Sequence, residues 1–484
     1  MKPHSFLALD LGAGSGRAIL GRIKDGSFDL KEIHRFPNTM VRLPDGLHWN
    51  TISLFEQCLE GIRKALEASE GTLASLGIDT WGVDYGLLGE RDELLGLPFA
   101  YRDSRTEGVW EGWSEADRKM IYQETGIQYM PFNTLVQIVA EARIGGAAWR
   151  NAKTFLNTPD LLNFWLTGVK RSEFTIASTT QMVDPSKREW SQAVLDWAGF
   201  PKSLFCPISM PGERLGEARL QRSGHYQATG VDVVLVASHD TASAEAVVPA
   251  LGDDHVWISA GTWSIMGMTL AQPNRSSAAL ASNMTNEGSV EGRSRFSRNI
   301  TGLWLVQECQ RIWGMDIKEA ASLAEDAPSP GAWVNSTQPE FLLPDSMPDL
   351  ISDWCAGTGQ PKPSSKAEIL RCAYESIALG HASCLQDIVD LTGRRPKAIH
   401  LVGGGSQSRL LCQMTSDMTG LPVVAGPVEA TSLGNIAVQM TAMGEIGSLA
   451  EARQMIMESA LTTTYEPKPD RDWAAVLRNA PKSR

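Results

Sequence analysis

The chain has 484 residues, 43% hydrophobic and 21% charged, which indicates two or three globular domains with large cores. Its 44 basic and 56 acidic residues give a net charge of −12, which argues against a nucleic-acid groove, because such a groove needs a basic stripe. A phosphate ligand is still compatible with this charge, since backbone N–H groups and Mg²⁺ hold phosphates on acidic proteins.

The N-terminus and the cysteines bear on the cellular compartment. The first residues lead directly into a strand without the apolar stretch of a signal peptide, and there is no run of about 18 apolar residues. The seven cysteines form no C-x-x-C pair, which is typical of buried thiols in a reducing compartment. We therefore expect a soluble cytoplasmic protein without a membrane partner. The sequence leaves a monomer and a dimer open, and it does not decide whether Cys355 and Cys372 are neighbours.

The first part of the chain predicts a β-meander, then a helix and another strand. Short loops join the first three strands, and loops this short allow only antiparallel pairing, because a parallel pair needs a crossover of about a dozen residues. Apolar residues at helical spacing follow, and the next apolar run ends in polar residues. The expected elements are strands over 6–11, 18–23 and 28–36, a helix over 51–69 and a strand over 73–82.

A glycine-bearing turn over residues 12–17 joins the first two strands. Its backbone N–H groups and Arg17 suit a phosphate, and the carboxylate of Asp10 suits a hydrated Mg²⁺. A dinucleotide-binding fold is excluded, because Arg17 stands where the third glycine belongs and a strand follows where a helix should begin. A Walker loop is excluded because the chain has no G-K-[ST]. The alternative is a plain hairpin without a ligand.

Residues 101–220 are less regular, and we interpret them as an insertion in the first domain. Loop-forming stretches at 101–105, 126–128 and 157–160 separate helices there. Before them, the segment DTWGVD at 79–84 places polar residues beside a tryptophan. This segment either binds a polyol or belongs to the core, and spacing alone does not choose between the two.

A buried strand over 233–237 lies near the middle of the chain and ends in four polar residues, SHDT. Asp240 therefore stands where ligands collect, beyond the carboxyl end of a strand in an open α/β sheet. Two roles are open for Asp240: catalysis, or capping of the helix that starts near Thr241. The rest of the chain favours catalysis.

The pattern of the N-terminal part starts again after Asp240, which predicts an internal duplication. Gly261 and Thr262 lie at the place of the first glycine-bearing turn, and two such turns suit the two ends of a triphosphate. Gly403-Gly404-Gly405 either lets a flat ring lie on the backbone or forms a tight turn. The expected elements are strands over 255–259, 265–270, 398–402 and 422–425, helices over 369–391, from 414 and over 431–443, and a C-terminal helix with a polar tail.

Together these segments resemble the sugar kinases of the FGGY carbohydrate kinase family. The resemblance covers nearly the whole chain, and it is specific because many motifs match at once. The matching stretches are DLGAGSGR (10–17), IDTWGVDY (78–85), YRDSRT (101–106), GIQYMPFNT (126–134), ASHDTASA (237–244), SAGTWSIMG (259–267), NITGLWLVQ (299–307), VGGG (402–405) and GPVEATSLGN (426–435).

The resemblance implies an α/β fold of two actin-like, ribonuclease H-like ATPase domains with a central interdomain cleft. It assigns a sugar-binding domain to 1–245 and a nucleotide-binding domain to 246–484, with the last helix as a candidate to pack back on the first domain. The implied reaction is ATP-dependent phosphorylation of the 1-hydroxyl of the ketose L-rhamnulose, with Mg²⁺ as cofactor. Closure of the two halves would exclude water. A kinase of L-fuculose or D-xylulose, and an actin-like ATPase without a sugar substrate, stay open as alternatives.

The resemblance also gives roles to individual residues. Asp240 corresponds to the catalytic base, and Asp10 is expected to hold Mg²⁺ through water. Gly14 departs from the family, which more often has a hydroxyl or acidic residue there, so only the backbone is expected to contact a phosphate at this position. The expected sugar contacts are Gly82, His239, Asp240, Thr241 and Asn299, and the expected ATP contacts are Ala13, Gly14, Ser15, Gly16, Arg17, Thr262, Gln307 and Gly404.

Overall fold

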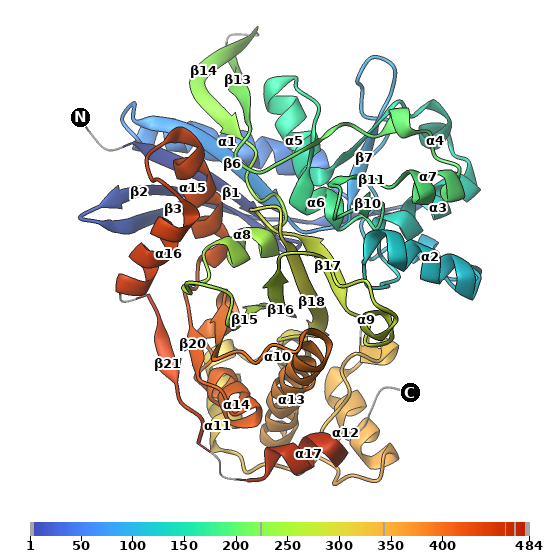
Figure 1. Ribbon diagram of the computed structural model, residues 1–484, viewed down its shortest axis with the longest axis vertical. Helices are drawn as coiled ribbons and strands as arrows, with labels where there is room; N and C mark the ends of the chain where they lie inside the picture. Colours follow the sequence, from blue (N-terminus) through green and yellow to red (C-terminus); the bar gives the residue numbers. More distant parts are fainter. Residues whose placement is uncertain (1–3, 223–224, 342–343, 460, 469–470, 480–484) are drawn as a thin grey trace. The chain divides into compact units, whose positions relative to one another are not determined.

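The computed structural model describes residues 4–222, 225–341, 344–459, 461–468 and 471–479. The chain divides into two compact units, and each is an α/β structure (Figure 1), which confirms the predicted fold class. Unit 1 consists of Met1–Val247, Thr269–Phe296 and Thr431–Ile456, and unit 2 consists of Val248–Met268, Ser297–Ala430 and Met457–Arg484.

Unit 1 is built on a six-stranded sheet in the order β13-β14-β6-β1-β2-β3. The predicted antiparallel meander of β1, β2 and β3 is confirmed, and β6 pairs in parallel with both β1 and β14. All seven residues of β1 are buried, as expected for a parallel central strand covered on both faces. The sheet strands are β1 (Ser5–Leu11), β2 (Ser15–Lys24), β3 (Ser27–Pro37), β6 (Leu73–Thr80), β13 (Arg214–Arg222) and β14 (His225–Val234).

The helices of unit 1 follow local sequence signals. Helix α1 buries Leu54, Cys58 and Ile62 at helical spacing, and the side chain of Asn50 caps its N-terminus by accepting from the Ser53 N–H. The helices are α1 (Thr51–Ala68), α2 (Glu115–Thr125), α3 (Thr134–Ile144), α4 (Ala147–Asn151), α5 (Thr158–Thr167), α6 (Phe174–Ser178), α7 (Gln192–Ala198), α8 (Asp240–Ala246), α9 (Ser277–Ala281), α15 (Ala430–Met443) and α16 (Leu449–Glu458), with one residue of α15 and two of α16 outside the unit.

Short strand pairs complete unit 1, and two local predictions need correction there. The glycine-bearing turn is shorter than predicted, because residues 15–17 already belong to β2. Residues 158–160, which were predicted to lie in a loop, form the first turn of α5, and this turn contains a proline. The short strands are β4 (Met40–Leu43), β5 (Gly46–Trp49), β7 (Tyr85–Leu88), β8 (Thr154–Asn157), β9 (Ser172–Glu173), β10 (Val183–Asp184), β11 (Glu189–Trp190), β12 (Ile208–Ser209) and β17 (Thr285–Gly288).

Unit 2 repeats the strand arrangement of unit 1. In both units a strand pairs with the next one as an antiparallel hairpin and with a later one in parallel: β1 with β2 and β6, and β15 with β16 and β19. The predicted duplication is therefore confirmed at the level of topology. Strands β15, β16 and β19 belong to a seven-stranded sheet in the order β17-β18-β16-β15-β19-β20-β21, in which β17 is the short strand named above. Its other strands are β15 (His255–Ala260), β16 (Trp263–Leu270), β18 (Ser294–Thr301), β19 (Ala398–Val402), β20 (Val423–Ala425) and β21 (Thr463–Tyr465).

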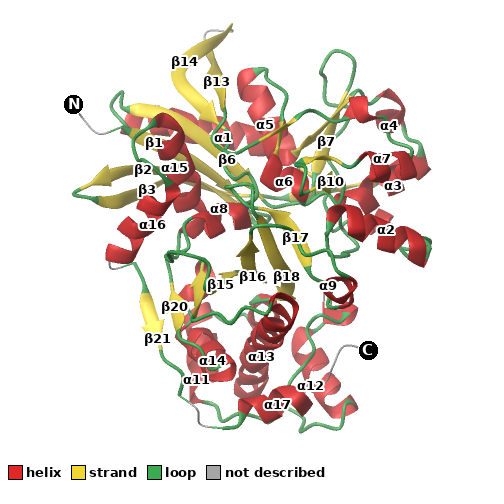
Figure 2. Ribbon diagram, viewed as in Figure 1, coloured by secondary structure: helices red, strands yellow, loops and turns green. Residues whose placement is uncertain are grey.

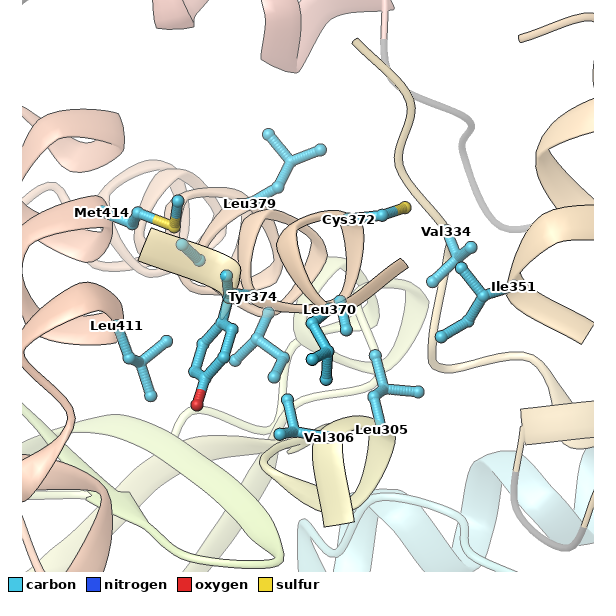
Figure 3. Close-up of a cluster of buried hydrophobic side chains, with 14 of the residues drawn as sticks. Leu305, Val306, Val334, Ile351, Leu370, Cys372, Tyr374, Leu379, Leu411 and Met414 are labelled. Carbon is cyan, nitrogen blue, oxygen red and sulfur yellow. The ribbon is translucent and has the colours of Figure 1, made fainter. Parts of the chain in front are cut away.

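The core of unit 2 is organised around the long helix α13. Figure 3 shows Leu370 and Tyr374 of α13 beside Val306 of α10 and Leu411 of α14, all buried. A capping box formed by Ser365 and Glu368 starts α13. Figure 2 shows the helices of this unit in red: α10 (Trp304–Trp313), α11 (Ile317–Asp326), α12 (Met347–Gly357), α13 (Lys366–Thr392), α14 (Arg409–Thr419) and α17 (Trp473–Asn479).

Some features of unit 2 differ from the prediction or were left undecided by it. Helix α14 starts at Arg409, five residues before the predicted start at Met414, because Ser408 caps it. The C-terminal part contains β21 and α17 besides the predicted helix. Cys355 and Cys372 are neighbours with their sulfur atoms 3.9 Å apart, and every cysteine is a free thiol. None of the helices in the described part of the chain has the length and apolar character that a membrane span requires.

Helix α15 contributes a row of buried polar side chains to unit 1. Ser432, Asn435 and Gln439 recur at helical spacing and are fully buried. Gln439 donates to the backbone carbonyl of Leu7 in β1 at 2.9 Å, so the helix is hydrogen-bonded to the central sheet. Gly434 allows α15 to lie close to α8, because a Cβ atom there would lie 1.8 Å from the carbonyl oxygen of Ser243 in α8.

We predict that Gly434→Ala lowers the free energy of unfolding by about 3 kcal/mol, since the new methyl group meets backbone that has to move. Urea unfolding measures this change. Gly357→Ala in α12 is the matched control, because a Cβ there meets no atom within 4 Å. The control should unfold like the native chain or be slightly more stable, and equal stability of the two variants would contradict the close contact.

Candidate active site

Three chain segments of unit 1 end side by side at one edge of its sheet. Asp10 of β1 and Asp79 of β6 are register partners, and Thr80 forms a parallel bridge with His239 in the segment after β14. The Thr80 N–H donates to the carbonyl of Ser238 at 2.8 Å, which extends this pairing. Because the carboxyl ends of parallel strands meet at the same edge, Asp10, Asp79 and Asp240 gather there.

Asp10 is bound by two donors. Arg17, its antiparallel partner on β2, donates to Oδ2 at 2.6 Å, and Ser432 of α15 donates to the same oxygen at 2.8 Å. The Asp10 side chain is only 9% exposed, so these donors offset the cost of burying its charge. The guanidinium expected to bind phosphate is thus already paired with a carboxylate.

The hairpin after Asp10 is held by its own backbone. The Gly12 N–H donates to the Ser15 carbonyl at 2.9 Å, so Ala13 and Gly14 form the tip of the turn. A Cβ atom at Gly14 would meet no atom within 4 Å, so the backbone there faces open space. Gly16 has a different role, because a Cβ atom there would lie 2.3 Å from the ring of Phe36. Of the predicted phosphate contacts on this hairpin, Gly14 therefore offers accessible backbone, Ala13 packs in part against the core of unit 1, and Gly16 serves packing.

Asp79 is fully buried and incompletely bonded. Its Oδ2 accepts from Asn435 at 2.6 Å, whereas Oδ1 has no hydrogen-bond partner. Burial raises the pKa of Asp79 well above its ordinary value, and the nearby charge of Asp10 adds to this increase. Asp79 is therefore expected to keep its proton above the pH at which an ordinary aspartate loses it.

Asp240 is the most exposed of the three carboxylates, with 34% of its side chain accessible. His239 occupies the N-cap position of α8, so Asp240 is a first-turn residue and not the cap that the alternative prediction required. Its Oδ1 accepts from the Thr241 N–H at 2.5 Å and from the Thr241 hydroxyl at 3.1 Å. Partial burial raises the pKa of Asp240, the charge of His239 lowers it, and that of Asp10 raises it.

The residues predicted to bind the sugar lie partly together. His239 Nε2 is 3.4 Å from Asp240 Oδ1, and a Cβ atom at Gly82 would lie 3.5 Å from the same Nε2. Gly82, His239, Asp240 and Thr241 therefore form one group in unit 1. Asn299 belongs to β18 in unit 2.

The residues on either side of Gly82 are anchored in the core of unit 1. Trp81 is 6% exposed, and its ring centre lies 4.3 Å from that of Trp49. Both indole N–H groups donate to Asp84 Oδ2, at 2.8 and 2.5 Å. Burial raises the pKa of Asp84 to about 6. Trp81 is thus a core residue, which favours the core alternative for this aromatic ring.

Val83 has a backbone conformation that valine rarely adopts, with φ at 70°. Its carbonyl accepts from the Thr134 hydroxyl at 2.6 Å, and its N–H donates to the Thr179 hydroxyl at 3.3 Å. These bonds hold a strained residue directly after Gly82. Strain of this kind persists where the surroundings fix the backbone, which is common in ligand-binding segments.

The predicted nucleotide contacts of unit 2 lie on the second hairpin, on α10 and on the glycine segment. Thr262 donates from its hydroxyl to Gln307 Oε1 at 3.0 Å, so these two residues are neighbours. Gly403 has φ at 83°, and a Cβ atom at Gly405 would lie 2.5 Å from the Cβ of Ala260, so both glycines satisfy a tight turn. A Cβ atom at Gly404 would meet nothing within 4 Å, which leaves its backbone open for a ligand.

Four residues of the site region were not predicted from the sequence. Ser432 and Asn435 bind Asp10 and Asp79, and their spacing of three on a predicted helix was a usable signal. Glu287 and Arg295 contact His239 from the chain segment after β16. No local pattern connects these two with a histidine that lies about fifty residues earlier.

The acidic residues fit magnesium only in part. The described part of the chain has no group of three or more His, Cys, Asp or Glu residues arranged to hold a metal ion. Mg²⁺ usually binds through one or two carboxylates, with water and substrate phosphates as further ligands. The carboxylate of Asp10 has the hard oxygen atoms that such a site needs, so it fits a hydrated Mg²⁺ carried by a nucleotide.

Sequence comparison identifies the family. The FGGY carbohydrate kinase N-terminal domain matches residues 5–246, and the C-terminal domain of the same family matches residues 256–443. The chain belongs to the FGGY family of carbohydrate kinases. It is therefore an ATP-dependent carbohydrate kinase with a small carbohydrate as substrate, and the family and enzyme class predicted from the sequence are confirmed.

Relatives within the FGGY family match the chain over almost its full length. It is 38% identical over 474 residues to a rhamnulokinase of Bacteroides thetaiotaomicron, with 98% of each chain covered. It is 39% identical over 485 residues to a rhamnulokinase of Pectobacterium carotovorum, with 99% of this chain and 96% of the relative covered. The similarity to these two relatives therefore extends over almost the whole of this chain.

Solved structures of FGGY-type kinases share the fold at low identity. A xylulose kinase from Lactobacillus acidophilus has a TM-score of 0.79 at 15% identity, covering 98% of this chain and 96% of its own. A glycerol kinase from Plasmodium falciparum has a TM-score of 0.76 at 14% identity, with the same coverage. These matches confirm the predicted two-domain kinase fold.

We predict that Asp79→Asn stabilises the protein more at higher pH. Below the ordinary pKa of 3.8, Asp79 is protonated in both states. As the pH rises above this value, the unfolded chain ionises while the folded chain keeps the proton, so stability falls until the folded pKa is reached. Asparagine removes this loss. Urea unfolding between pH about 5 and 8 should show a difference between variant and native chain that grows with pH. A difference that is constant across this range would contradict a raised pKa.

Proposed function

We propose that this kinase transfers the γ-phosphoryl group of ATP to the 1-hydroxyl of L-rhamnulose, giving L-rhamnulose 1-phosphate and ADP. Support for the sugar comes from two full-length relatives at 38% and 39% identity, both named as rhamnulokinases. The chemistry rests on a single observation, the position of Asp240. Its carboxylate is accessible, belongs to the first turn of α8, and lies at the edge of the sheet where Asp10 and Asp79 also lie.

Asp240 is proposed as the general base. Phosphoryl transfer depends mainly on positioning and charge neutralisation, and the base orients the attacking hydroxyl and takes its proton. Oδ1 of Asp240 already accepts two bonds from Thr241, which fix the carboxylate. The carboxylate is thereby held in one orientation while part of it stays open to a substrate.

The binding residues are proposed in two groups. Gly82, His239, Thr241 and Asn299 bind the sugar. The nucleotide is bound by Ala13, Gly14, Ser15, Gly16, Arg17, Thr262, Gln307 and Gly404. We further propose that the sugar-binding domain spans 1–245 and the nucleotide-binding domain 246–484, with contributions across this boundary from individual residues.

Charge on the transferred group needs compensation. Arg17 supplies a guanidinium group beside Asp10, and Ser432 orients that carboxylate. Mg²⁺, when bound with ATP and held by Asp10 through water, would neutralise charge on the phosphate oxygens. We expect the nucleotide to draw Arg17 partly away from Asp10, because a phosphate offers a competing set of charged acceptors.

We predict that Asp240→Asn lowers kcat by about a hundredfold or more, because the amide cannot accept the proton, while the affinity for ATP stays nearly unchanged. Coupled detection of ADP measures turnover, and calorimetric titration with ATP measures affinity. Asp29→Asn on β3 is the matched control, since its side chain is exposed and pairs with Arg22 on the neighbouring strand. Native turnover in Asp240→Asn would remove this carboxylate from the mechanism.

A panel of ketoses tests the substrate. We expect kcat/KM for L-rhamnulose to exceed that for L-fuculose and for D-xylulose by about tenfold or more, with phosphate on C1 of the product by NMR. A higher value for either other ketose would assign the enzyme to that sugar. ADP release that no ketose stimulates would favour an ATPase without a sugar substrate.

A further inference from the structure

A buried ion pair lies directly behind the proposed sugar-binding histidine. Arg295 is completely buried; its Nη2 donates to Glu287 Oε2 at 2.9 Å, and its Nε donates to the carbonyl of Gly288 at 2.8 Å. Although burial raises the pKa of Glu287, the neighbouring charge of Arg295 is the largest influence that lowers it, and the net shift is downward. Glu287 is therefore charged at neutral pH, and Arg295 is held in place by two acceptors.

The third contact of Arg295 reaches the imidazole ring. Its Nη2 lies 2.8 Å from His239 Nδ1, whereas Glu287 Oε2 lies 3.3 Å from the same nitrogen. A guanidinium group has donors only, so Nδ1 has to accept at this short distance. A proton on Nδ1 would set donor against donor at 2.8 Å. In the neutral ring the proton then belongs on Nε2.

The protonated nitrogen faces the proposed base. Nε2 of His239 lies 3.4 Å from Asp240 Oδ1. A Cβ atom at Gly82 would lie 3.5 Å from the same nitrogen. With its proton on Nε2 the ring presents a donor to the carboxylate and to a sugar oxygen. With its proton on Nδ1 the ring would present a lone pair to a carboxylate, which is repulsive.

We propose that Arg295, held by Glu287, is a positioning residue that fixes His239 as the Nε2–H tautomer, so that the ring donates toward Asp240 and the sugar. Neither Arg295 nor Glu287 touches the substrate in this scheme. The proposal deepens the function proposed above and rests on the assignment of Asp240 and His239 to the sugar site.

The tautomer can be observed directly. NMR of ¹⁵N-histidine-labelled protein distinguishes a protonated ring nitrogen from an accepting one, and His239→Gln identifies the signal of this ring among the eight histidines. We expect Nδ1 to be the acceptor and Nε2 to carry the proton in the native chain. A proton on Nδ1 in the native chain would overturn the proposal without any variant.

Two variants test the cause. Arg295→Met alone would leave the Glu287 charge buried without its partner, so the double variant Arg295→Met with Glu287→Met removes both charges. We expect it to populate the Nδ1–H tautomer and to lose about tenfold or more in kcat, with the KM for ATP unchanged. Arg295→Lys keeps a donor and should restore Nε2–H and part of the turnover. An unchanged tautomer in the double variant, or no recovery with lysine, would overturn the proposal.

Arg275→Met serves as the matched control. Arg275 also pairs with a carboxylate of unit 1, Asp184, at 3.2 Å, and it donates to the carbonyl of Glu124. Its replacement should leave the ring signals of His239 and the turnover unchanged; loss of the Nε2–H signal there would show that the signal reports general damage and would overturn the assignment to Arg295. If Asp240→Asn kept native turnover, the proposed base would fall, while the tautomer measurement would still decide the role of Arg295.

Discussion

The site of unit 1 depends on one constraint, which is that parallel strands deliver their carboxyl-terminal side chains to the same edge of the sheet. The register of β1 with β6, and the bridge from Thr80 to His239, bring Asp10, Asp79 and Asp240 to that edge. Three acidic groups in a poorly solvated place repel one another, and their ionised forms are expensive to bury. The structure accommodates each of the three carboxyl groups in a different way.

Asp10 accepts hydrogen bonds from Arg17 and Ser432, whereas Asp79 is held by a single amide and is expected to stay neutral. Asp240 keeps contact with solvent, at 34% exposure of its side chain. The same chemical group thus has three properties within one cluster: a carboxylate paired with an arginine, a buried acid and an accessible carboxylate. Helix α15 supplies one donor to Asp10, from Ser432, and one to Asp79, from Asn435. A late segment of the chain thus contributes to a site whose first residue is Asp10.

Much of this arrangement follows from the sequence, because buried parallel strands have continuous apolar runs with polar residues at their ends. That pattern predicted β1 and β6, together with the repeated hairpin in unit 2. The strand predicted over 233–237 was placed too late in the chain, because β14 spans His225–Val234 and the buried residues 235–238 lie outside a strand. The same pattern placed Arg17 in a turn, because the pairing of Leu11 with Gly16 that extends β2 depends on the hairpin register and not on composition.

Features stabilised by distant partners could not be predicted from local patterns. The exposed strand β21 exists through its pairing with β20, as in the register of Val423 with Tyr465. The start of α14 was predicted five residues too late for another reason, because the N-cap signal at Ser408 is local and was not used in the prediction. In the sequence, Arg295 and Glu287 look like ordinary charged residues of two neighbouring strands. Only the folded structure shows that they contact each other and His239.

The pair of Glu287 and Arg295 is informative because a buried ion pair is a weak source of stability. Desolvation of both charges opposes their attraction, and apolar residues of similar volume often stabilise a core as well or better. Stability therefore does not explain why a fully buried arginine lies beside the proposed sugar-binding histidine. The short contact of this arginine with Nδ1 provides a reason: a permanent donor on one side of an imidazole decides what the other side presents. In this fold that other side faces Asp240, so a charge 56 residues along the chain determines the hydrogen-bonding character of the group next to the proposed base.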